Sequence, residues 1–463
     1  MASFLDDLPA SHARARAARP RARARTTPSP LVGRVLLILA GAGLAGVLLL
    51  FSLTETGAAL SAPGGLFTGL GRFFAFTGTY AMAIMVLLAA RLPGLERAVG
   101  HDRLVRWHRT IGGWPIAAIA LHIIFITLGY AQTTSTGVLH EFVTLLFHYP
   151  DVMASLVGFS LLVMAGLASA KIARSKMKYE TWWVVHLYMY LGLALAFAHQ
   201  FRIGVVFLTH SWARAAWIAG AIVVAVVALT SRVGAPVLFN LRHRLRVASV
   251  AEEGPGIYSV TIRGRHLEDL DVAGGQFFLW RFVTRDLWWH AHPYSLSAMP
   301  RPPFLRITVK AVGDASARLA HLAAGTRVLV EGPYGSFTRH RARRPRVTLI
   351  GAGVGVTPLA ALLEDLDERV DVSVVVRAST SQELIHRDEI AAMVAARGGT
   401  FHELVGPRAK VRLDARHLRQ LVPAIAQSDV FICGPSDFND AVATALAKAG
   451  VGAGHIHREE FAF

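Results

Sequence analysis

Long runs of hydrophobic residues occupy the first half of the chain, and each is long enough to cross a bilayer as a helix. They cover roughly residues 31–53, 73–91, 110–130, 152–170, 182–208 and 212–231. The fifth run holds two histidines and Arg202, so hydropathy leaves its outer end open. The pattern predicts a six-helix α transmembrane bundle over residues 31–232.

The second half changes to short alternating segments separated by glycine turns, which is typical of strands. Segments 258–262, 276–280, 305–309 and 327–330 predict an antiparallel β-barrel over residues 240–340. A different order follows: strand (347–350), glycine turn (351–358), helix (359–366), and later buried strands at 372–376 and 429–433. This order predicts a Rossmann-like α/β domain with a parallel sheet over residues 345–463. The predicted fold class is therefore multi-domain.

Every second loop between the predicted spans is rich in basic residues. The 92–109 and 171–181 connections and the segment after the sixth run are basic, whereas 54–71 and 131–151 contain no lysine or arginine. The positive-inside rule then places both termini on the cytoplasmic side of the cell membrane. These loops and an arginine-rich tail over 1–30, expected to be disordered and cytoplasmic, explain most of the net charge of +17. The charge therefore favours membrane lipid as the partner and disfavours nucleic acid.

The chain contains a single cysteine, Cys433. One thiol cannot supply the ligands of an iron–sulfur cluster, form a disulfide within the chain, or provide a Cys-x-x-Cys-His site for covalent haem. Any haem is therefore of the b type, held without thioether bonds.

Four histidines lie in the hydrophobic runs at matched spacings: His108 and His122 in the third, His186 and His199 in the fifth. Helical rise separates the first pair by about 21 Å and the second by about 20 Å, so two levels match in height. Ionisable residues are costly inside a bilayer, and ligation of two stacked b-type haems is one reason to keep them there. Packing or a hydrogen bond is the alternative for each histidine alone. Thirteen residues miss the starting face of an ideal helix by about 140°, which calls for a distorted helix or different haem angles.

Three further segments are candidates for cofactor chemistry. A strand ends in 292–297 with an aromatic ring beside a hydroxyl, 331–335 predicts a tight aromatic turn at the close of the barrel, and 433–435 follows the last long strand. Each alone is also compatible with an ordinary turn or core contact. The glycine turn after the strand at 347–350 lets backbone amides approach a pyrophosphate at a helix N-terminus, so it predicts nucleotide binding.

In this order, after six membrane runs, the motifs resemble those of the NADPH oxidase and ferric reductase superfamily over about residues 31–463. That resemblance implies a six-helix bis-haem domain fused to a dehydrogenase similar to ferredoxin–NADP reductase. It implies that His292, Pro293, Tyr294 and Ser295 form the flavin motif, with Tyr294 stacked on the isoalloxazine ring and Ser295 near its reactive nitrogen. The other residues it implicates in cofactor binding are Lys310, Gly313 and Ser316 for the FAD phosphates, Gly351, Gly353, Gly355, Thr357 and Pro358 for the pyridine nucleotide, and Cys433 with Gly434 at the site of hydride transfer.

The same resemblance implies that Phe463 covers the flavin until nicotinamide displaces it, which makes Phe463, Ser295 and Cys433 the candidates for direct contact with the reacting groups. One departure concerns the last residues. Plant-type reductases carry a carboxylate two residues before the final aromatic, but Phe461 stands at that position here, which leaves the role of Glu460 open.

Arg377 follows the buried strand at 372–376, where an NAD enzyme tends to place a carboxylate for the ribose. A guanidinium there suits the 2′-phosphate of NADPH, because its planar fork binds phosphate bidentately. An ordinary surface turn after a strand is the alternative.

Together these features predict an NAD(P)H-dependent flavohaem oxidoreductase. Electrons would pass from cytoplasmic NADPH through FAD and two haems to an outer acceptor, either oxygen or a ferric chelate. No obligate protein partner is evident. Two other classes stay open: a haem-bearing membrane subunit whose soluble half docks a partner, and a transporter that uses the histidines as a proton relay.

Overall fold

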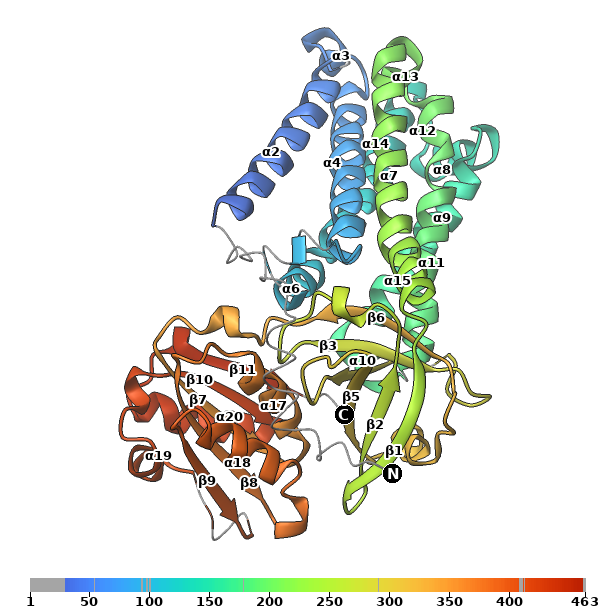
Figure 1. The fold of residues 1–463 in the computed structure, drawn as a ribbon. Helices are drawn as coiled ribbons and strands as arrows, with labels where there is room; N and C mark the ends of the chain where they lie inside the picture. Colours follow the sequence, from blue (N-terminus) through green and yellow to red (C-terminus); the bar gives the residue numbers. More distant parts are fainter. Residues whose placement is uncertain are drawn as a thin grey trace. The chain divides into compact units, whose positions relative to one another are not determined.

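The computed structural model describes residues 30–53, 55–92, 95–96, 99, 101–177, 179–289, 291–407, 411 and 413–460. The chain divides into two compact units, one ending at Val233 and the other running from Gly234 onward (Figure 1). Each unit is described separately below.

Among the described residues up to His243, six helical spans are long and apolar enough to cross a membrane. The helices that build them are α2 (Pro30–Ser52), α4 (Gly65–Ala89), α6 (His101–Ile111) with α7 (Gly113–Thr134), α9 (Val152–Ser169), α11 (Tyr179–Leu195) with α12 (Ala198–Ile203), and α14 (Ser211–Leu229). Shorter helices are α3 (Gly57–Ser61), α8 (Val138–His148), α10 (Lys171–Lys176), α13 (Val205–Thr209) and, after a π-helical turn at Thr230–Gly234, α15 (Ala235–His243). The six-helix prediction is confirmed.

Several predicted spans have different limits in the structure: the third starts at Arg103 and the sixth runs to His243, and two more differences have a local cause. The second span begins at Gly65, eight residues before the predicted start, because Arg72 lies inside α4 and pairs with the buried carboxylate of Glu55 at 2.7 Å. The predicted fifth span, 182–208, is broken into α11, α12 and α13. Hydropathy alone does not locate that break, since the window from Thr181 to Ile203 scores as one membrane span.

Close glycine contacts hold the membrane helices in pairs, with α4 against α7 and α9 against α11. A Cβ on Gly158 would lie 2.6 Å from the carbonyl oxygen of Gly192, and a Cβ on Gly192 would lie 2.7 Å from that of Gly158. Only residues without a side chain permit such an approach of two backbones, as at other membrane helix crossings.

The second unit begins with six antiparallel strands. One sheet has the order β1 (Arg246–Gly254), β2 (Ile257–Arg263), β5 (Phe304–Lys310), and the other has β4 (His292–Ser295), β3 (Phe277–Phe282), β6 (Val328–Tyr334). Bridges between Leu296 and Ile307 and between Arg246 and Arg327 join the two sheets into a ring. Large side chains of β3, including Trp280 and Phe282, are fully buried inside it. The antiparallel β prediction is therefore confirmed.

The predicted aromatic turn at 331–335 is wrong for most of its length. Residues through Tyr334 continue strand β6, with Glu331 opposite Leu279 and Tyr334 opposite Phe277. The glycine and proline that suggest a turn are accommodated within the strand, since β6 supplies one extra residue opposite the Phe277–Leu279 step of β3.

A five-stranded parallel sheet forms the rest of the second unit (Figure 1). Its order is β11 (Ile456–Glu460), β10 (Asp429–Gly434), β7 (Arg346–Ala352), β8 (Asp371–Ala378) and β9 (Thr400–Val405). Helices α17 (Val356–Asp365) and α18 (Arg387–Ala395) share one apolar core with the sheet, and α19 (Ala415–Leu421) and α20 (Ser436–Lys448) share the other. The predicted α/β domain with a parallel sheet is confirmed, and its first helix starts three residues earlier than expected.

We expect Gly192→Leu to destabilise the membrane unit, because the new side chain collides with the backbone of α9. Overpacking of this kind costs about 1–3 kcal/mol, which a lower apparent melting temperature in detergent would report. Gly220→Leu is the matched control, since a Cβ there meets nothing within 4 Å. Equal melting temperatures for the two variants would contradict the close crossing.

Candidate functional site

The structure brings the four membrane histidines together as two pairs. The ring centroids of His108 (α6) and His186 (α11) lie 6.1 Å apart, and those of His122 (α7) and His199 (α12) lie 6.5 Å apart. Two imidazoles that bind one metal from opposite sides, with metal–nitrogen bonds of about 2 Å, have centroids roughly 6 Å apart. The pairing matches the two levels expected from the sequence.

The break between α11 and α12 removes the mismatch expected for an ideal helix. Because α11 ends at Leu195 and α12 begins at Ala198, His186 and His199 do not lie on one straight helix. Of the two explanations left open by the spacing, the structure has the distorted helix.

A neighbouring helix holds the Nδ1 atom of every one of these rings. Two acceptors are backbone carbonyls of α4: Met85 O lies 3.2 Å from His108 Nδ1, and Gly71 O lies 2.9 Å from His122 Nδ1. A carbonyl can only accept, so both imidazoles carry their proton on Nδ1. This tautomer leaves Nε2 as the nitrogen with a lone pair for a metal, the usual arrangement of ligating histidines.

The other two rings use serine hydroxyls of α9 in the same way. Ser155 Oγ lies 2.8 Å from His199 Nδ1 and donates its own proton to Asp151 O at 2.8 Å. Ser169 Oγ lies 3.2 Å from His186 Nδ1 and donates to Ala165 O at 2.7 Å. With its one proton given to the carbonyl, each hydroxyl accepts from the Nδ1–H of its histidine, and this is the tautomer that leaves Nε2 available. Sequence reasoning missed these serines, because they stand 44 and 17 residues from their histidines.

The predicted flavin motif lies on β4, in the wall of the barrel. The rings of His292 and Tyr294 are stacked, with centroids 5.9 Å apart and 18° between planes, and Trp280 Nε1 donates to Tyr294 O at 2.9 Å. Burial raises the pKa of the Tyr294 phenol, so the ring stays neutral. Pro293, between the two rings, pairs with Leu279 of β3.

Ser295, next along β4, is 4% exposed, and its hydroxyl has no hydrogen-bond partner among the described residues. A buried hydroxyl without a partner is uncommon and calls for a ligand or an unseen polar group. This orphaned atom fits a flavin that accepts or donates a hydrogen bond at this edge of the strand.

The residues expected at the FAD phosphates follow β5. Lys310 Nζ lies 3.8 Å from Glu383 Oε1, and Ser316 Oγ accepts from the backbone amides of Val312 and Gly313 at 3.0 and 3.1 Å. In the described structure Ser316 thus closes the turn into α16 (Asp314–Ala317), while Gly313 borders open space.

The glycine turn lies at the carboxyl edge of the parallel sheet. Gly351, next to the last residue of β7, pairs with Cys433 of β10, and a Cβ on Gly355 would collide with the carbonyl oxygen of Cys433. Gly353 has a positive φ of 53° and borders open space. Both properties suit a loop whose backbone amides approach the phosphate of a ligand. Gly434 is buried at the end of β10.

Two further members of this motif build the start of α17. Thr357 Oγ1 donates to Val354 O at 2.9 Å, and Pro358 is buried in the first turn of the helix, where its missing N–H is not needed. The structure therefore brings the glycine turn and the 433–435 segment together, although they are far apart in the sequence.

Arg377 lies near the end of β8, in register with Ala352 of the glycine turn. Its Nη2 donates to Gly406 O at 3.4 Å, so the side chain extends along the same edge. Glu383, which sequence reasoning missed, accepts from Ser379 N at 3.0 Å. The signal was present, because Thr380-Ser381-Gln382-Glu383 has the spacing of a helix capping box.

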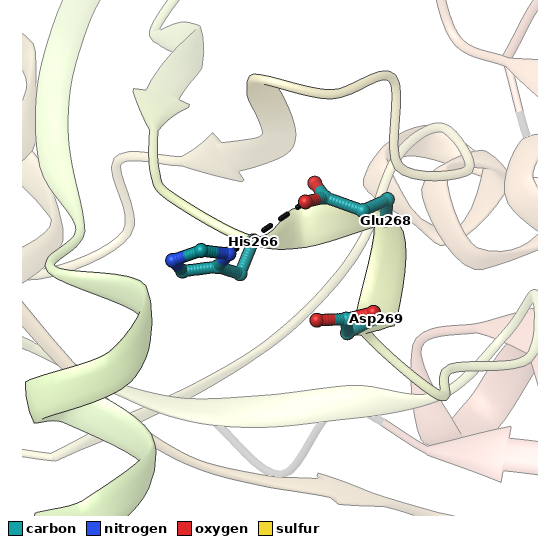
Figure 2. Close-up of side chains that lie close together, drawn as sticks. All are labelled: His266, Glu268 and Asp269. Atoms are coloured by element: carbon teal, nitrogen blue, oxygen red, sulfur yellow. Dashed lines mark ion pairs between the residues drawn. The ribbon is translucent and has the colours of Figure 1, made fainter.

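Several predicted features lie outside the described residues: Phe463, Phe461, the side chain of Glu460 and the tail over 1–29. Figure 2 shows one other group of potential metal ligands, His266, Glu268 and Asp269. All three are exposed, Arg242 pairs with Asp269 at 2.6 Å, and His266 Nδ1 lies 3.7 Å from Glu268. We therefore interpret this cluster as a set of surface ion pairs and not as a metal site.

Comparison with known proteins finds matches to parts of the chain. Residues 74–197 match the family described as "Ferric reductase like transmembrane component". The match includes His108, His122 and His186 and stops two residues before His199. The chain thus combines six candidate membrane spans, which include a segment similar to the ferric reductase transmembrane component, with similarity to reductase proteins over little more than a third of its length.

Individual relatives share part of the chain. It is 29% identical over 188 residues to the glycine betaine monooxygenase reductase subunit of Chromohalobacter salexigens, covering 36% of this chain and 50% of the relative. It is 29% identical over 184 residues to an NADPH oxidoreductase of Mycobacterium tuberculosis, covering 38% and 48%. The flavohem-like FAD/NAD binding domain of a Vibrio cholerae nitric oxide dioxygenase aligns with a TM-score of 0.39 and 24% identity, covering 48% of this chain and 99% of that one. The chain spans about half the length of the curated relatives it matches.

We expect Cys433 to resist alkylation in the folded protein. Burial, with a smaller contribution from Glu459, raises the pKa of this thiol well above its usual range, so it stays protonated and unreactive near pH 8. Because the chain has a single cysteine, mass spectrometry after maleimide treatment reads this site directly. Full labelling in denaturant is the control, and equally fast labelling without denaturant would contradict a closed sheet edge.

Proposed function

We propose that this protein is a transmembrane oxidoreductase that passes electrons from cytoplasmic NADPH, through FAD and two b-type haems, to an extracytoplasmic acceptor. The single observation that carries the proposal is the arrangement of four intramembrane histidines in two pairs, each ring held through Nδ1. Oxygen and ferric chelates are the acceptor classes that the proposal includes.

His108 and His186 would hold one haem and His122 and His199 the other. The centroid distances would suit one haem per pair, and protonation of Nδ1 would leave Nε2 as the ligating nitrogen. The hydrogen bonds also keep the rings from turning, which favours ligation over a proton relay. A relay needs a ring that exchanges protons at both nitrogens, whereas Ser155 and Ser169 already donate to carbonyls.

The second unit would bind FAD and NADPH. Ser295 offers its orphaned hydroxyl and Tyr294 its neutral ring to the flavin, while the glycine turn with Gly434 and Cys433 offers backbone close to the nucleotide. When bound, these groups supply hydride donation by nicotinamide, division of the electron pair by flavin, and one-electron relay by haem iron. The chain's own part is to orient the groups and keep water away.

Charge supports an orientation with both termini in the cytoplasm. The basic connections all fall on one side of the six spans. Two arginines near the proposed outer ends are paired with carboxylates: Arg72 with Glu55 at 2.7 Å and Arg202 with Asp151 at 3.4 Å. Their charges are therefore locally balanced and do not oppose this orientation.

We expect His199→Ala to remove the outer haem, since one of its two ligands is lost. About half of the Soret absorbance should disappear, while anaerobic reduction of the flavin by NADPH continues at the unmodified rate. Superoxide formation and ferric reduction, measured side by side, should both fall in the variant, and their ratio in the unmodified protein identifies the acceptor.

The matched control is His140→Ala, an exposed histidine on α8. It should keep full haem content and turnover. The proposed route would be contradicted if His199→Ala lost flavin reduction as strongly as it loses superoxide formation and ferric reduction. An unchanged Soret band in this variant would also contradict it.

We expect the unmodified protein to prefer NADPH, and Arg377→Ala to weaken that preference. Loss of a charge-assisted hydrogen bond to a 2′-phosphate should raise KM for NADPH by about tenfold or more, with little effect on NADH. Arg346→Ala is the control, because Arg346 lies at the opposite end of β7 in an exposed pair with Asp371. Higher kcat/KM with NADH in the unmodified protein would overturn the assignment.

A further inference from the structure

Buried charged side chains connect the barrel to the helices of the parallel sheet. Arg306 of β5 is 7% exposed and Glu389 of α18 is 8% exposed, and Arg306 Nη2 donates to Glu389 Oε2 at 2.8 Å. Burying two charges is costly, and a buried pair adds little net stability over apolar packing. The pair is therefore more informative about geometry than about stability.

Arg306 also binds the segment that leaves the flavin motif. Its Nε donates to Ser297 Oγ and its Nη2 to Ser297 O, both at 3.0 Å. Ser297 stands two residues after Ser295, so one guanidinium fixes the end of β4 to α18. Beside it, Thr308 Oγ1 lies 2.9 Å from His386 Nε2. Burial, together with the nearby Arg306, lowers the pKa of His386 to about 3, so this ring adds no charge at neutral pH.

A second set of contacts joins the same part of the barrel to α17. Met299 N donates to Glu364 Oε2 at 2.9 Å, and Arg301 lies 3.5 Å from Glu364 and 3.9 Å from Glu389. Gly274, just before β3, donates its N–H to Asp365 Oδ2 at 3.0 Å. A Cβ on Gly274 would lie 2.1 Å from Ala361 O, so the barrel backbone lies directly against this helix.

These contacts span the two halves of the proposed hydride-transfer site. On the barrel side they attach to the segment that follows Ser295, and on the other side to α17, which begins at the glycine turn. We propose that Arg306, Glu364 and Glu389, with Arg301, form a clamp of positioning residues that fixes the flavin-binding strand relative to the nucleotide loop. This inference rests on the proposed function of the unit as a flavin reductase.

Directional contacts suit this task better than apolar ones. Ile257 and Phe337 from the barrel side also join the apolar core under α17, but such contacts hold surfaces together without fixing their register. Contacts between domains otherwise permit relative motion unless they are large and apolar. A misplacement of about 1 Å between reacting groups can slow a reaction by about a hundredfold, so a fixed register matters for hydride transfer.

The test uses the full-length protein loaded with FAD, and the variants Glu389→Gln, Glu364→Gln and Arg306→Lys. Each keeps the shape or the charge of the side chain while weakening the clamp. Three quantities are measured: flavin content, affinity for NADP+, and the limiting rate of anaerobic flavin reduction by NADPH and by its deuterated form. The matched control is Arg387→Gln. Arg387 lies on the same helix, α18, and the substitution breaks its exposed pair with Glu403 of β9.

We expect flavin content and NADP+ affinity to stay within about twofold, and the limiting reduction rate to fall about tenfold or more in at least Glu389→Gln. The deuterium isotope effect should rise as hydride transfer becomes slower, and Arg306→Lys should retain part of the rate. Arg387→Gln should match the unmodified protein.

Limiting rates within twofold of the unmodified protein would overturn the clamp. So would a parallel loss of flavin, nucleotide affinity and rate, because that pattern marks a general structural role. If Arg306→Lys fails to fold, the two isosteric glutamine variants decide the outcome. Failure of the proposed function has a different signature, since NADPH would then not reduce the flavin of the unmodified protein.

Discussion

Hydrogen bonds from the Nδ1 atoms of four histidines to neighbouring helices are the interactions on which the membrane unit depends. An imidazole in a bilayer must satisfy its N–H, and here each finds an acceptor on α4 or α9. Close helix packing makes these acceptors reachable. Gly71, whose carbonyl accepts from His122, would carry a Cβ only 2.7 Å from Ile126 of α7, so the missing side chain and the hydrogen bond belong to the same contact.

The histidine-bearing part of the bundle thus contains two closely packed pairs, α4 with α7 and α9 with α11. In each pair one helix, together with the short helix next to it, carries the two histidines. The other helix accepts the hydrogen bonds from Nδ1 and so fixes which ring nitrogen is protonated. The second unit follows a comparable rule, because the residues proposed to touch cofactors lie at strand ends, while Arg306, Glu364 and Glu389 behind them set the spacing. In both units, polar contacts placed behind the site determine how the site side chains are presented.

Much of this architecture is predictable from the sequence. Hydrophobic runs, alternating segments and the glycine turn indicate the six spans, the antiparallel β domain and the parallel α/β domain, and the motif resemblance is confirmed at the level of domain class. Those features depend on local periodicity, which a single sequence displays. The domain limits and the roles of the individual site residues, including Phe463, stay predictions.

The features that the sequence does not reveal depend on distant contacts. Arg72 marks a false helix start, because its neutralising partner Glu55 lies on a separate segment. The break after Leu195 falls inside a segment that hydropathy scores as one membrane span, and the 331–334 segment continues a strand although it contains glycine and proline. Ser155, Ser169 and the clamp are invisible for the same reason, since each acts on a residue that only the fold brings near.

The central claim is that four fixed imidazoles ligate two haems. Low-temperature electron paramagnetic resonance of the oxidised, purified protein, combined with a pyridine haemochrome assay, tests it most directly. The account predicts two b-type haems per chain and only low-spin signals from bis-imidazole iron. A single haem, no haem, or a dominant high-spin signal would contradict it.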